Sequence, residues 1–287
     1  MKLEGRGIVI TGANQGLGKA IAAKCIEEGA NVLLCARAEE MLGRARSELA
    51  SAAHQGQMVL AQRADVSRRE DVRRLFDTAR NNLPHLDGLV NNAGVLGPKG
   101  LLEEIDVEGW CHAIEINLFG AVFACREVLP IFRRQGYGKI VNLSGGGATA
   151  PVPRISAYAA SKAAVVRLTE TLAEETRGAG IDINAVAPGA LNTRLLDQIL
   201  AEKPETVGPD LYARSLKQKQ RGGAPIHQAA DLCVFLLSGA SDGITGKLIS
   251  AVWDPWQDLA KRVDELNRTD VYTLRRIAPK DRGLSWE

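Results

Sequence analysis

The stretch GIVITGANQGLG, residues 7–18, decides the fold of this 287-residue chain. Its first five residues form a short apolar run typical of a buried strand, and a helical pattern follows over 16–28. Glycines between a strand and a helix let the backbone turn tightly and approach a pyrophosphate, while the helix N-terminus supplies free N–H groups. The spacing G-x3-G-x-G is one residue looser than the dinucleotide fingerprint, and alone it would also fit an ordinary tight loop.

Beyond this turn, short apolar runs alternate with amphipathic stretches along the chain. We expect strands at 7–11, 31–36, 57–64, 86–90, 139–143, 181–187 and 247–252. Helices are expected at 16–28, 38–53, 67–82, 156–177 and 229–237, with one long helix within 106–134. Strands that recur with helices between them predict βαβ units and a parallel sheet covered on both faces. The sequence therefore predicts an α/β protein, a doubly wound parallel sheet of the Rossmann type, and favours a phosphate-binding role for the glycine turn.

One helix start carries a more specific signal. Ser67 precedes the helical pattern at 67–82, and Glu70 follows it three residues later. This spacing is typical of a capping box, in which the serine hydroxyl and the glutamate carboxylate satisfy free N–H groups of the first turn. We therefore expect Ser67 to be the N-cap of this helix.

Composition excludes several classes of protein. The chain is 45% hydrophobic and 24% charged, which is typical of a globular protein. Its net charge of +2 is too small to indicate binding to nucleic acid. No apolar run approaches the ~18 residues of a membrane span, and the N-terminus lacks a cleavable signal pattern. We therefore expect a soluble, cytoplasmic protein with no nucleic-acid or membrane partner.

Cysteines and histidines give no sign of cross-links or a metal. The five cysteines stand singly, without a CxxC pair, and are expected to be buried thiols in a reducing compartment. The four histidines are far apart in sequence and show no metal-ligand spacing, so no metal site is expected.

The end of the second predicted strand bears on the choice of cofactor. This position lies near the adenosine ribose in a dinucleotide fold, where an acid suits NAD and an arginine accommodates the 2′-phosphate of NADP. The sequence reads Cys35-Ala36-Arg37, with no acid at this point. An exposed loop arginine is the alternative, and Gln15 adds no second cation in the glycine turn. The sequence thus favours NADP(H), with NAD(H) possible.

Tyr158 and Lys162 form the candidate reacting pair. Their i, i+4 spacing in the helix predicted at 156–177 places both side chains on one face. A tyrosine with an ordinary pKa near ~10 is a poor acid or base at neutral pH, and a nearby ammonium brings that pKa toward the working range. Such pairs also occur by chance on helix faces, so the spacing alone is weak.

Together these motifs resemble the short-chain dehydrogenase/reductase superfamily over about residues 5–251. The matching residues, in the family's order, are Thr11-Gly12, Gly16, Gly18, Asp65-Val66, Asn91-Asn92-Ala93-Gly94, Asn117, Tyr158, Lys162, Pro188-Gly189 and Thr193. The resemblance implies that Tyr158 is the acid/base on the substrate oxygen, that Lys162 binds the nicotinamide ribose and lowers the tyrosine pKa, and that Asn117 holds a relay water. The cofactor-binding residues expected on all these grounds are Gly12, Asn14, Gln15, Gly16, Leu17, Gly18, Arg37, Asp65, Val66, Asn91, Ala93, Gly94, Tyr158, Lys162, Pro188, Gly189 and Thr193.

The sequence departs from the family pattern at one catalytic position. The family usually places a serine thirteen residues before the tyrosine, where its hydroxyl polarises the substrate carbonyl. That position here is Gly145, and the nearest serine is Ser144, inside NLSGGG at 142–147. Three successive glycines make the loop pliable, so we expect Ser144 to replace the missing hydroxyl. Ser156 and Thr149 are weaker candidates.

The second departure is a C-terminal extension. We expect a catalytic domain at 1–251 and an extension at 252–287 that contains Trp253, Trp256 and Trp286. Large aromatic residues concentrated in a tail indicate packing, either over the substrate mouth or on a neighbouring subunit, with a disordered tail as the alternative.

We therefore expect an NADP-preferring oxidoreductase that moves a hydride between nicotinamide and a carbonyl or alcohol carbon. The alternative is a dinucleotide-binding sensor or scaffold of the same fold that has lost turnover, which only Gly145 favours. Its substrate is a small carbonyl or alcohol, and the basic residues within 190–225 either contact an anionic group or form a solvated helix face. The apolar stripes within 114–132 and 165–172 exceed what one sheet face needs, and the corresponding helices of the family pair between subunits, so a homodimer or homotetramer is expected.

Overall fold

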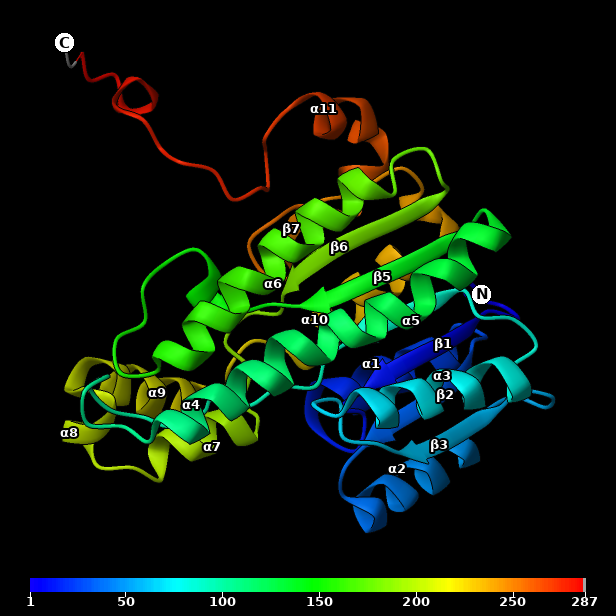
Figure 1. Ribbon diagram of the computed structural model, residues 1–287, viewed down its shortest axis with the longest axis horizontal. Helices are drawn as coiled ribbons and strands as arrows, with labels where there is room; N and C mark the ends of the chain where they lie inside the picture. The colour runs from blue at the N-terminus through cyan, green and yellow to red at the C-terminus, as the bar shows by residue number, and fades with distance from the viewer. Residues whose placement is uncertain (286–287) are drawn as a thin grey trace.

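Strand β1 (Gly7–Thr11) lies inside a seven-stranded sheet whose neighbouring strands all pair in parallel. The computed structural model describes residues 1–285 (Figure 1). The strand order is β3-β2-β1-β4-β5-β6-β7, so the chain runs outward from β1 to β3 and then returns to β4 on the other side of β1. The remaining strands are β2 (Asn31–Ala36), β3 (Val59–Arg63), β4 (Gly88–Asn91), β5 (Gly138–Leu143), β6 (Ile181–Ala187) and β7 (Leu248–Ser250).

Helices cover both faces of this sheet. One face carries α1 (Gly16–Glu27), α2 (Glu39–Ser51) and α10 (Ile226–Leu237), and the other carries α3 (Arg69–Asn82), α5 (Gly120–Gln135) and α6 (Ser156–Glu175). The chain also forms α4 (Val107–Ile114), α7 (Arg194–Leu200), α8 (Pro204–Val207), α9 (Pro209–Arg221) and α11 (Val263–Arg268). Helices α4 and α7 to α9 gather at the end of the sheet toward which the strand arrows point (Figure 1). The doubly wound α/β fold predicted from the sequence is confirmed.

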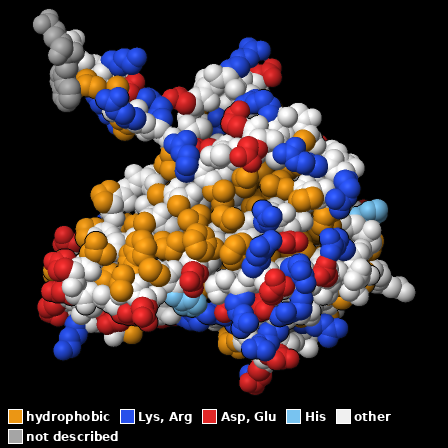
Figure 2. All heavy atoms as spheres, in the orientation of Figure 1, with side chains coloured by type: hydrophobic (Ala, Val, Ile, Leu, Met, Phe, Trp, Pro, Cys, Tyr) orange, Lys and Arg blue, Asp and Glu red, His pale blue; other side chains and the backbone are white. Residues whose placement is uncertain are grey.

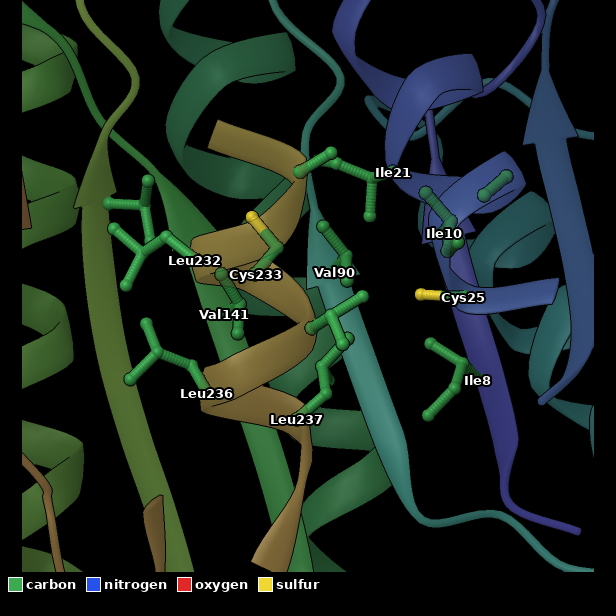
Figure 3. Packing of buried hydrophobic residues seen from close by; sticks show 14 of the residues in the cluster. Ile8, Ile10, Ile21, Cys25, Val90, Val141, Leu232, Cys233, Leu236 and Leu237 are labelled. Carbon is green, nitrogen blue, oxygen red and sulfur yellow. The ribbon is translucent and has the colours of Figure 1, made fainter. Parts of the chain in front are cut away.

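Two apolar clusters hold the layers together. Side chains alternate along β1, so Ile8 and Ile10 join the cluster under α1 and α10, whereas Val9 joins the cluster on the opposite face. Figure 3 shows Leu232, Cys233, Leu236 and Leu237 of α10 directed at the strands, beside Val90 and Val141. Because the inner strands are buried on both faces, they are nearly continuous apolar runs, which is the reason they could be recognised in the sequence.

The long helix expected within 106–134 is not continuous. Helix α4 ends at Ile114, a π-helical turn spans Glu115–Phe119, and α5 begins at Gly120. A π-turn inserts one extra residue per turn and is often found at functional sites. The apolar stripe alone did not reveal it, because the stripe continues through the turn.

The N-cap expected at Ser67 is wrong. Helix α3 begins at Arg69, and the preceding residue makes no side-chain capping bond. The hydroxyl and the backbone N–H of Ser67 instead both donate to Asp65 Oδ1, at 2.7 and 3.0 Å. The serine is therefore used to orient the carboxylate of Asp65.

The expectation of buried cysteines is also wrong at Cys111, which is exposed, while the other four are buried.

Residues 252–274 of the C-terminal extension lie against the outer edge of the sheet and α10. The Trp256 ring lies 5.8 Å from the Phe235 ring, and Leu259 and Leu266 belong to the buried cluster of that face. The backbone N–H of Leu248 in β7 donates to the carbonyl of Tyr272. Trp253, in contrast, is 84% exposed, and Trp286 lies outside the described residues. Beyond Leu274 the chain leads away from the body (Figure 1).

None of the helices within residues 1–285 combines the length and the apolar character needed to cross a membrane.

Candidate active site

A cleft of about 450 Å³ lies at the carboxyl ends of the strands, where the chain changes direction between β1 and β4. Ligands of open α/β sheets bind at such a switch point because the loops on either side lead in opposite directions and leave a crevice. The glycine turn, the ends of β2 and β4, the loop after β5, the start of α6 and the segment after β6 all line this cleft.

The glycine turn is fixed by the loop after β4. Gly12 has φ +64°, and a Cβ placed on it would lie 2.8 Å from Ala93 Cα, so a side chain has no room there. The Asn92 side chain donates to the carbonyls of Thr11 (2.9 Å) and Gly12 (3.1 Å), while Thr11 Oγ1 accepts the Asn92 and Ala93 N–H groups. A Cβ on Gly18 would overlap Asn92 Nδ2 and the Gly12 carbonyl. Glycine is therefore needed at positions 12 and 18 so that the two loops meet.

Gly16 differs from these two glycines because it faces the open cleft. It has φ +56° and is exposed, and the nearest atom to a Cβ placed on it is Thr193 Cγ2 at 3.8 Å. The backbone at the start of α1 is thus open to a ligand and presents the positive end of the helix dipole. This bare, glycine-lined cradle fits the pyrophosphate of a dinucleotide.

The end of the cleft beside β2 and β3 holds one cation and one anion. Arg37 is half-exposed, and its Nη1 lies 3.8 Å from Asp65 Oδ2. Partial burial raises the pKa of the Asp65 carboxyl, but the hydrogen bonds from Ser67 and the charge of Arg37 outweigh burial and leave the pKa below its usual value. Asp65 is therefore ionised at neutral pH, and within residues 1–285 no other carboxylate lies close enough to Arg37 to hold it away from a bound phosphate.

Tyr158 and Lys162 lie side by side at the start of α6. Lys162 Nζ lies 5.7 Å from the centre of the Tyr158 ring and donates to the carbonyl of Leu143 at 2.7 Å. Burial lowers the pKa of Lys162 from 10.5 to about 8, and burial raises the pKa of Tyr158. The lowered tyrosine pKa that the family resemblance implies is thus not seen in the protein alone, because the loss of water around the phenol dominates.

The glycine loop after β5 packs directly on this tyrosine. A Cβ placed on Gly145 would overlap Tyr158 Oη, so the phenol occupies the space that a side chain at position 145 would need. Ser144 is buried beside the cleft, and its hydroxyl donates to the carbonyl of Lys162 over a long 3.3 Å. Ser144 and Tyr158 therefore both border the cleft, with no side chain between them from Gly145.

Asn117 lies behind Lys162 in the π-helical turn. Its amide exchanges two hydrogen bonds with the backbone of Val95 and donates a third, at 2.9 Å, to Ser161 Oγ. A separate cavity of about 10 Å³ is bordered by Thr11, Asn91, Asn117 and Lys162 among others, which is about the volume of one water molecule. The π-turn thus brings a polar, water-sized space next to the lysine.

Most residues expected to bind a cofactor or to take part in catalysis border the main cleft, with three exceptions. Gly18 is buried behind the turn, and Asn117 borders only the small cavity. Asn91 is directed away from the cleft, because its side chain donates to Asn142 Oδ1 at 2.8 Å. The residues of the expected set that border the main cleft are Gly12, Asn14, Gln15, Gly16, Leu17, Arg37, Asp65, Val66, Ala93, Gly94, Ser144, Tyr158, Lys162, Pro188, Gly189 and Thr193.

Several residues that border the cleft were not recognised in the sequence. Asn92, inside a motif that was recognised, holds the glycine turn in place. Leu195 and Ile199 of α7, and Leu211, Ser215 and Gln218 of α9, close the other end of the cleft. In the sequence, the three α9 residues are spaced i, i+4, i+7, which places them on one face of a helix. This spacing does not tell whether that face is turned toward the cleft.

A parallel sheet with a phosphate turn at its switch point and a Tyr–Lys pair beside it defines a dinucleotide-dependent oxidoreductase. The comparisons with known proteins agree. The family model of short chain dehydrogenases matches residues 6–204. The chain is 36% identical over 249 residues to 3beta-hydroxysteroid dehydrogenase 1 of Eggerthella lenta, covering 85% of this chain and 91% of that protein. It is 37% identical over 243 residues to 11-beta-hydroxysteroid dehydrogenase of Pinus massoniana, covering 84% of this chain and 66% of that protein.

Solved structures show the same likeness. Levodione reductase superposes with a TM-score of 0.80 at 29% identity, covering 90% of this chain and 99% of that one. This chain therefore belongs to the short-chain dehydrogenase/reductase family, and it is an NAD(P)-dependent oxidoreductase of hydroxyl and carbonyl groups.

Proposed function

We propose that this protein is an NADP(H)-preferring oxidoreductase in which Tyr158 is the acid/base for a small carbonyl or alcohol substrate. The observation that carries the proposal is the arrangement of one cleft with Arg37 at its β2 end and Tyr158 beside Lys162 at its α6 end. Similar solved structures include an NAD+-bound xylitol dehydrogenase and a gluconate 5-dehydrogenase in complex with NADP, so membership of the family does not decide between the cofactors.

The residues of the cleft fit an extended dinucleotide. Gly12, Gly16 and the N-terminus of α1 would hold the pyrophosphate, Asp65 would hold the adenosine, and Thr193 would hold the nicotinamide end. Arg37 would pair with a 2′-phosphate, a charge-assisted contact that NAD lacks. When bound, the nicotinamide supplies or accepts the hydride, while the protein positions the substrate and moves the proton.

Tyr158 would donate its phenolic proton to the substrate oxygen during reduction and accept it back during oxidation. Lys162, placed next to the phenol, would stabilise the phenolate electrostatically. The water-sized cavity beside Asn117 and Lys162 supports a path by which the proton is replaced, because a water there has polar partners on several sides.

Ser144 would supply the second hydrogen bond to the substrate oxygen. Within residues 1–285 the only hydrogen bond of its hydroxyl is the long one to the Lys162 carbonyl, and rotation about χ1 moves the hydroxyl between such positions at small cost. A donor aimed at the developing oxyanion typically contributes a factor of about 10²–10³ in rate.

Cofactor titration tests the proposed preference. The unmodified protein should bind NADPH more tightly than NADH, and Arg37→Ala should remove most of that difference, equivalent to roughly 1.5–3 kcal/mol. Arg44→Ala is the matched control, because Arg44 is exposed on the nearby helix α2, pairs with Glu40 and does not border the cleft. Equal affinities for the two cofactors in the unmodified protein would remove the NADP preference.

Turnover separates an enzyme from the sensor or scaffold that Gly145 alone favours. Steady oxidation of NADPH in the presence of a carbonyl substrate, lost in Tyr158→Phe, supports the enzyme. Tight cofactor binding with no turnover of any carbonyl or alcohol would favour the sensor.

The proposal also covers the division of the chain into domains and its oligomeric state. Residues 1–251 form the catalytic domain, and residues 252–287 form an extension that packs on this domain and, beyond Leu274, on a neighbouring subunit of a homodimer or homotetramer. Contacts of Trp256, Leu259 and Leu266 support the first part, and the course of the chain after Leu274 supports the second.

A further inference from the structure

We infer that Ser215 is a specificity-determining residue, and that the preferred substrate is an uncharged, largely apolar secondary alcohol or ketone with a second hydrogen-bonding group. This inference rests on the proposed function, because it concerns the substrate of the same cleft. It adds the chemical class of the substrate and one residue that would recognise it.

The walls of the substrate end of the cleft are apolar. Leu96, Ile155 and Ile199 are buried in one cluster, and Leu195 and Leu211 pack against it together with the ring of Tyr158. These side chains come from the loop after β4, the start of α6, α7 and α9, so they surround the phenol from several directions. A substrate held here would bury hydrocarbon, which contributes about 25 cal/mol per Å² of apolar surface.

The charged side chains of α9 do not enter this end of the cleft. Arg214, Lys217, Lys219 and Arg221 of α9 are all exposed and absent from the cleft lining, so the basic run forms the outer, solvated face of the helix. The charged residues that border the cleft are Arg37 and Asp65 at the adenosine end, Lys162 beside Tyr158, and Arg194, which is exposed. Apart from Lys162, which the proposed reaction already uses, the described residues that line the cleft include no buried cation for a sugar acid or another anionic substrate.

Ser215 is the exception on the apolar wall. It is only 4% exposed and borders the cleft, yet its hydroxyl makes no hydrogen bond with any of residues 1–285. A helical serine commonly donates to the carbonyl four residues earlier, and this one does not. Glu170 Oε2 is the one fully buried side-chain oxygen or nitrogen of residues 1–285 that lacks a hydrogen-bond partner, so the Ser215 hydroxyl is accessible from the cleft. A ligand oxygen that takes the place of cleft water can therefore bond to it directly.

The position of Ser215 on α9 explains why its partner must come from the cleft. Leu211, Ser215 and Gln218 follow one another at i, i+4 and i+7, and all three border the cleft. Gln218 is already held, because its Nε2 donates to Asn192 Oδ1 at 3.2 Å. The serine hydroxyl is therefore the unengaged polar group of this helix face, and a hydroxyl or keto oxygen on the substrate, away from the reacting carbon, would satisfy it.

Paired substrates test this inference. Cyclohexanol is compared with cyclohexanediol, and a steroid monoalcohol with the corresponding diol, each with NADP+. The unmodified protein should favour one or both diols, and Ser215→Ala should lower kcat/KM for the favoured diol by about 3- to 10-fold while leaving the monoalcohol unchanged. Ser215→Thr, which keeps the hydroxyl, should retain the preference, and Lys217→Ala on the outer face of α9 should alter neither substrate.

Binding of each alcohol to the NADP+ complex is titrated beside turnover. If no alcohol or ketone is turned over by the unmodified protein, the proposed function fails, while a diol affinity that Ser215→Ala weakens still supports the Ser215 contact. Equal losses for diol and monoalcohol in Ser215→Ala, or no loss for either, in turnover and in binding, would overturn the inference.

Discussion

At the scale of single residues, the absence of a side chain at position 145 sets the position of Tyr158. The phenolic oxygen occupies the space into which a Cβ on Gly145 would project. The backbone of Gly145 is extended, with φ 177°, so a serine would be tolerated by the backbone and excluded only by the phenol. A serine hydroxyl therefore cannot simply be returned to this position, and the second donor must come from a neighbour such as Ser144.

Two neighbouring substitutions test this explanation. Gly145→Ser should lower turnover by at least about 10-fold, because the new side chain displaces Tyr158 Oη. Ser144→Ala should lower turnover by about 10²-fold, because the substrate oxygen loses one donor. Both variants should keep the NADPH affinity of the unmodified protein, measured by fluorescence titration. A Gly145→Ser enzyme faster than the unmodified one, or full turnover in Ser144→Ala, would show that the donor lies elsewhere.

Lys162, also at the scale of single residues, shows what the burial of a charge costs in free energy of unfolding. Burial lowers its pKa from 10.5 to about 8, so between these pH values the folded protein binds fewer protons than the unfolded chain. Stability therefore rises with pH across this window, and the cost of the buried charge is fully present below about pH 8. The upper limit of that cost is about 3 kcal/mol, from 1.36 kcal/mol for each pKa unit.

Lys162→Met should reveal this cost. At pH 7 the variant should unfold at higher urea concentration than the unmodified protein, although turnover is lost, because it removes a buried charge and keeps the packing. The gain in the free energy of unfolding should shrink as pH rises from about 8 through 10.5, because above this range the lysine is neutral in both states. A variant less stable than the unmodified protein at pH 7 would contradict this account, and the Leu143 carbonyl left without its donor reduces the gain.

At the scale of helices and strands, the sequence predicts the regular elements that bury apolar side chains. Strand β2 matches its expected range, because a strand buried on both faces is a nearly continuous apolar run bounded by turns. The π-turn at Glu115–Phe119 escaped prediction, since one additional residue in a helix does not break an apolar stripe. Within the segment 190–225, α7 and α8 are seven and four residues long, which is too short for periodicity to be read.

The candidate site also contains residues that could be predicted from the sequence and residues that could not. The glycine turn, Arg37, Tyr158 and Lys162 were predicted because their chemistry depends on local spacing, and the cleft brings them together. Asn91 was assigned to the cofactor, but its amide is directed at Asn142 on the neighbouring strand, a contact between residues 51 positions apart. Ser215 could not be assigned, because only the packing of α9 against α7 and α6 determines which helix face borders the cleft.

At the scale of the whole molecule, the helices that cover one face of the sheet have an apolar outer surface. The face that carries α4, α5 and α6 has a broad hydrophobic band in Figure 2. Within it Phe119 is 45% exposed, and its ring lies 6.2 Å from that of Phe123. Leu118, Val122, Leu168 and Leu172 remain half-buried. A contiguous apolar band larger than a few hundred Å² is rare on a monomer and typically marks a surface that is buried by association.

This band should join two copies about a two-fold axis, since an isologous contact buries the same surface on both copies. A stable interface of this kind typically buries ~1,200–2,000 Å² in total. Phe119→Glu places a charge in the band, so the protein should become a monomer by light scattering at micromolar concentration while retaining its circular dichroism spectrum. Leu216→Glu is the matched control, because Leu216 is 41% exposed on the outer face of α9 and lies outside the band. An unmodified protein that is monomeric under these conditions would refute the assembly, and a Phe119→Glu dimer would move the interface to the edge formed by β7 and the extension, where Val271 and Ile277 are also exposed.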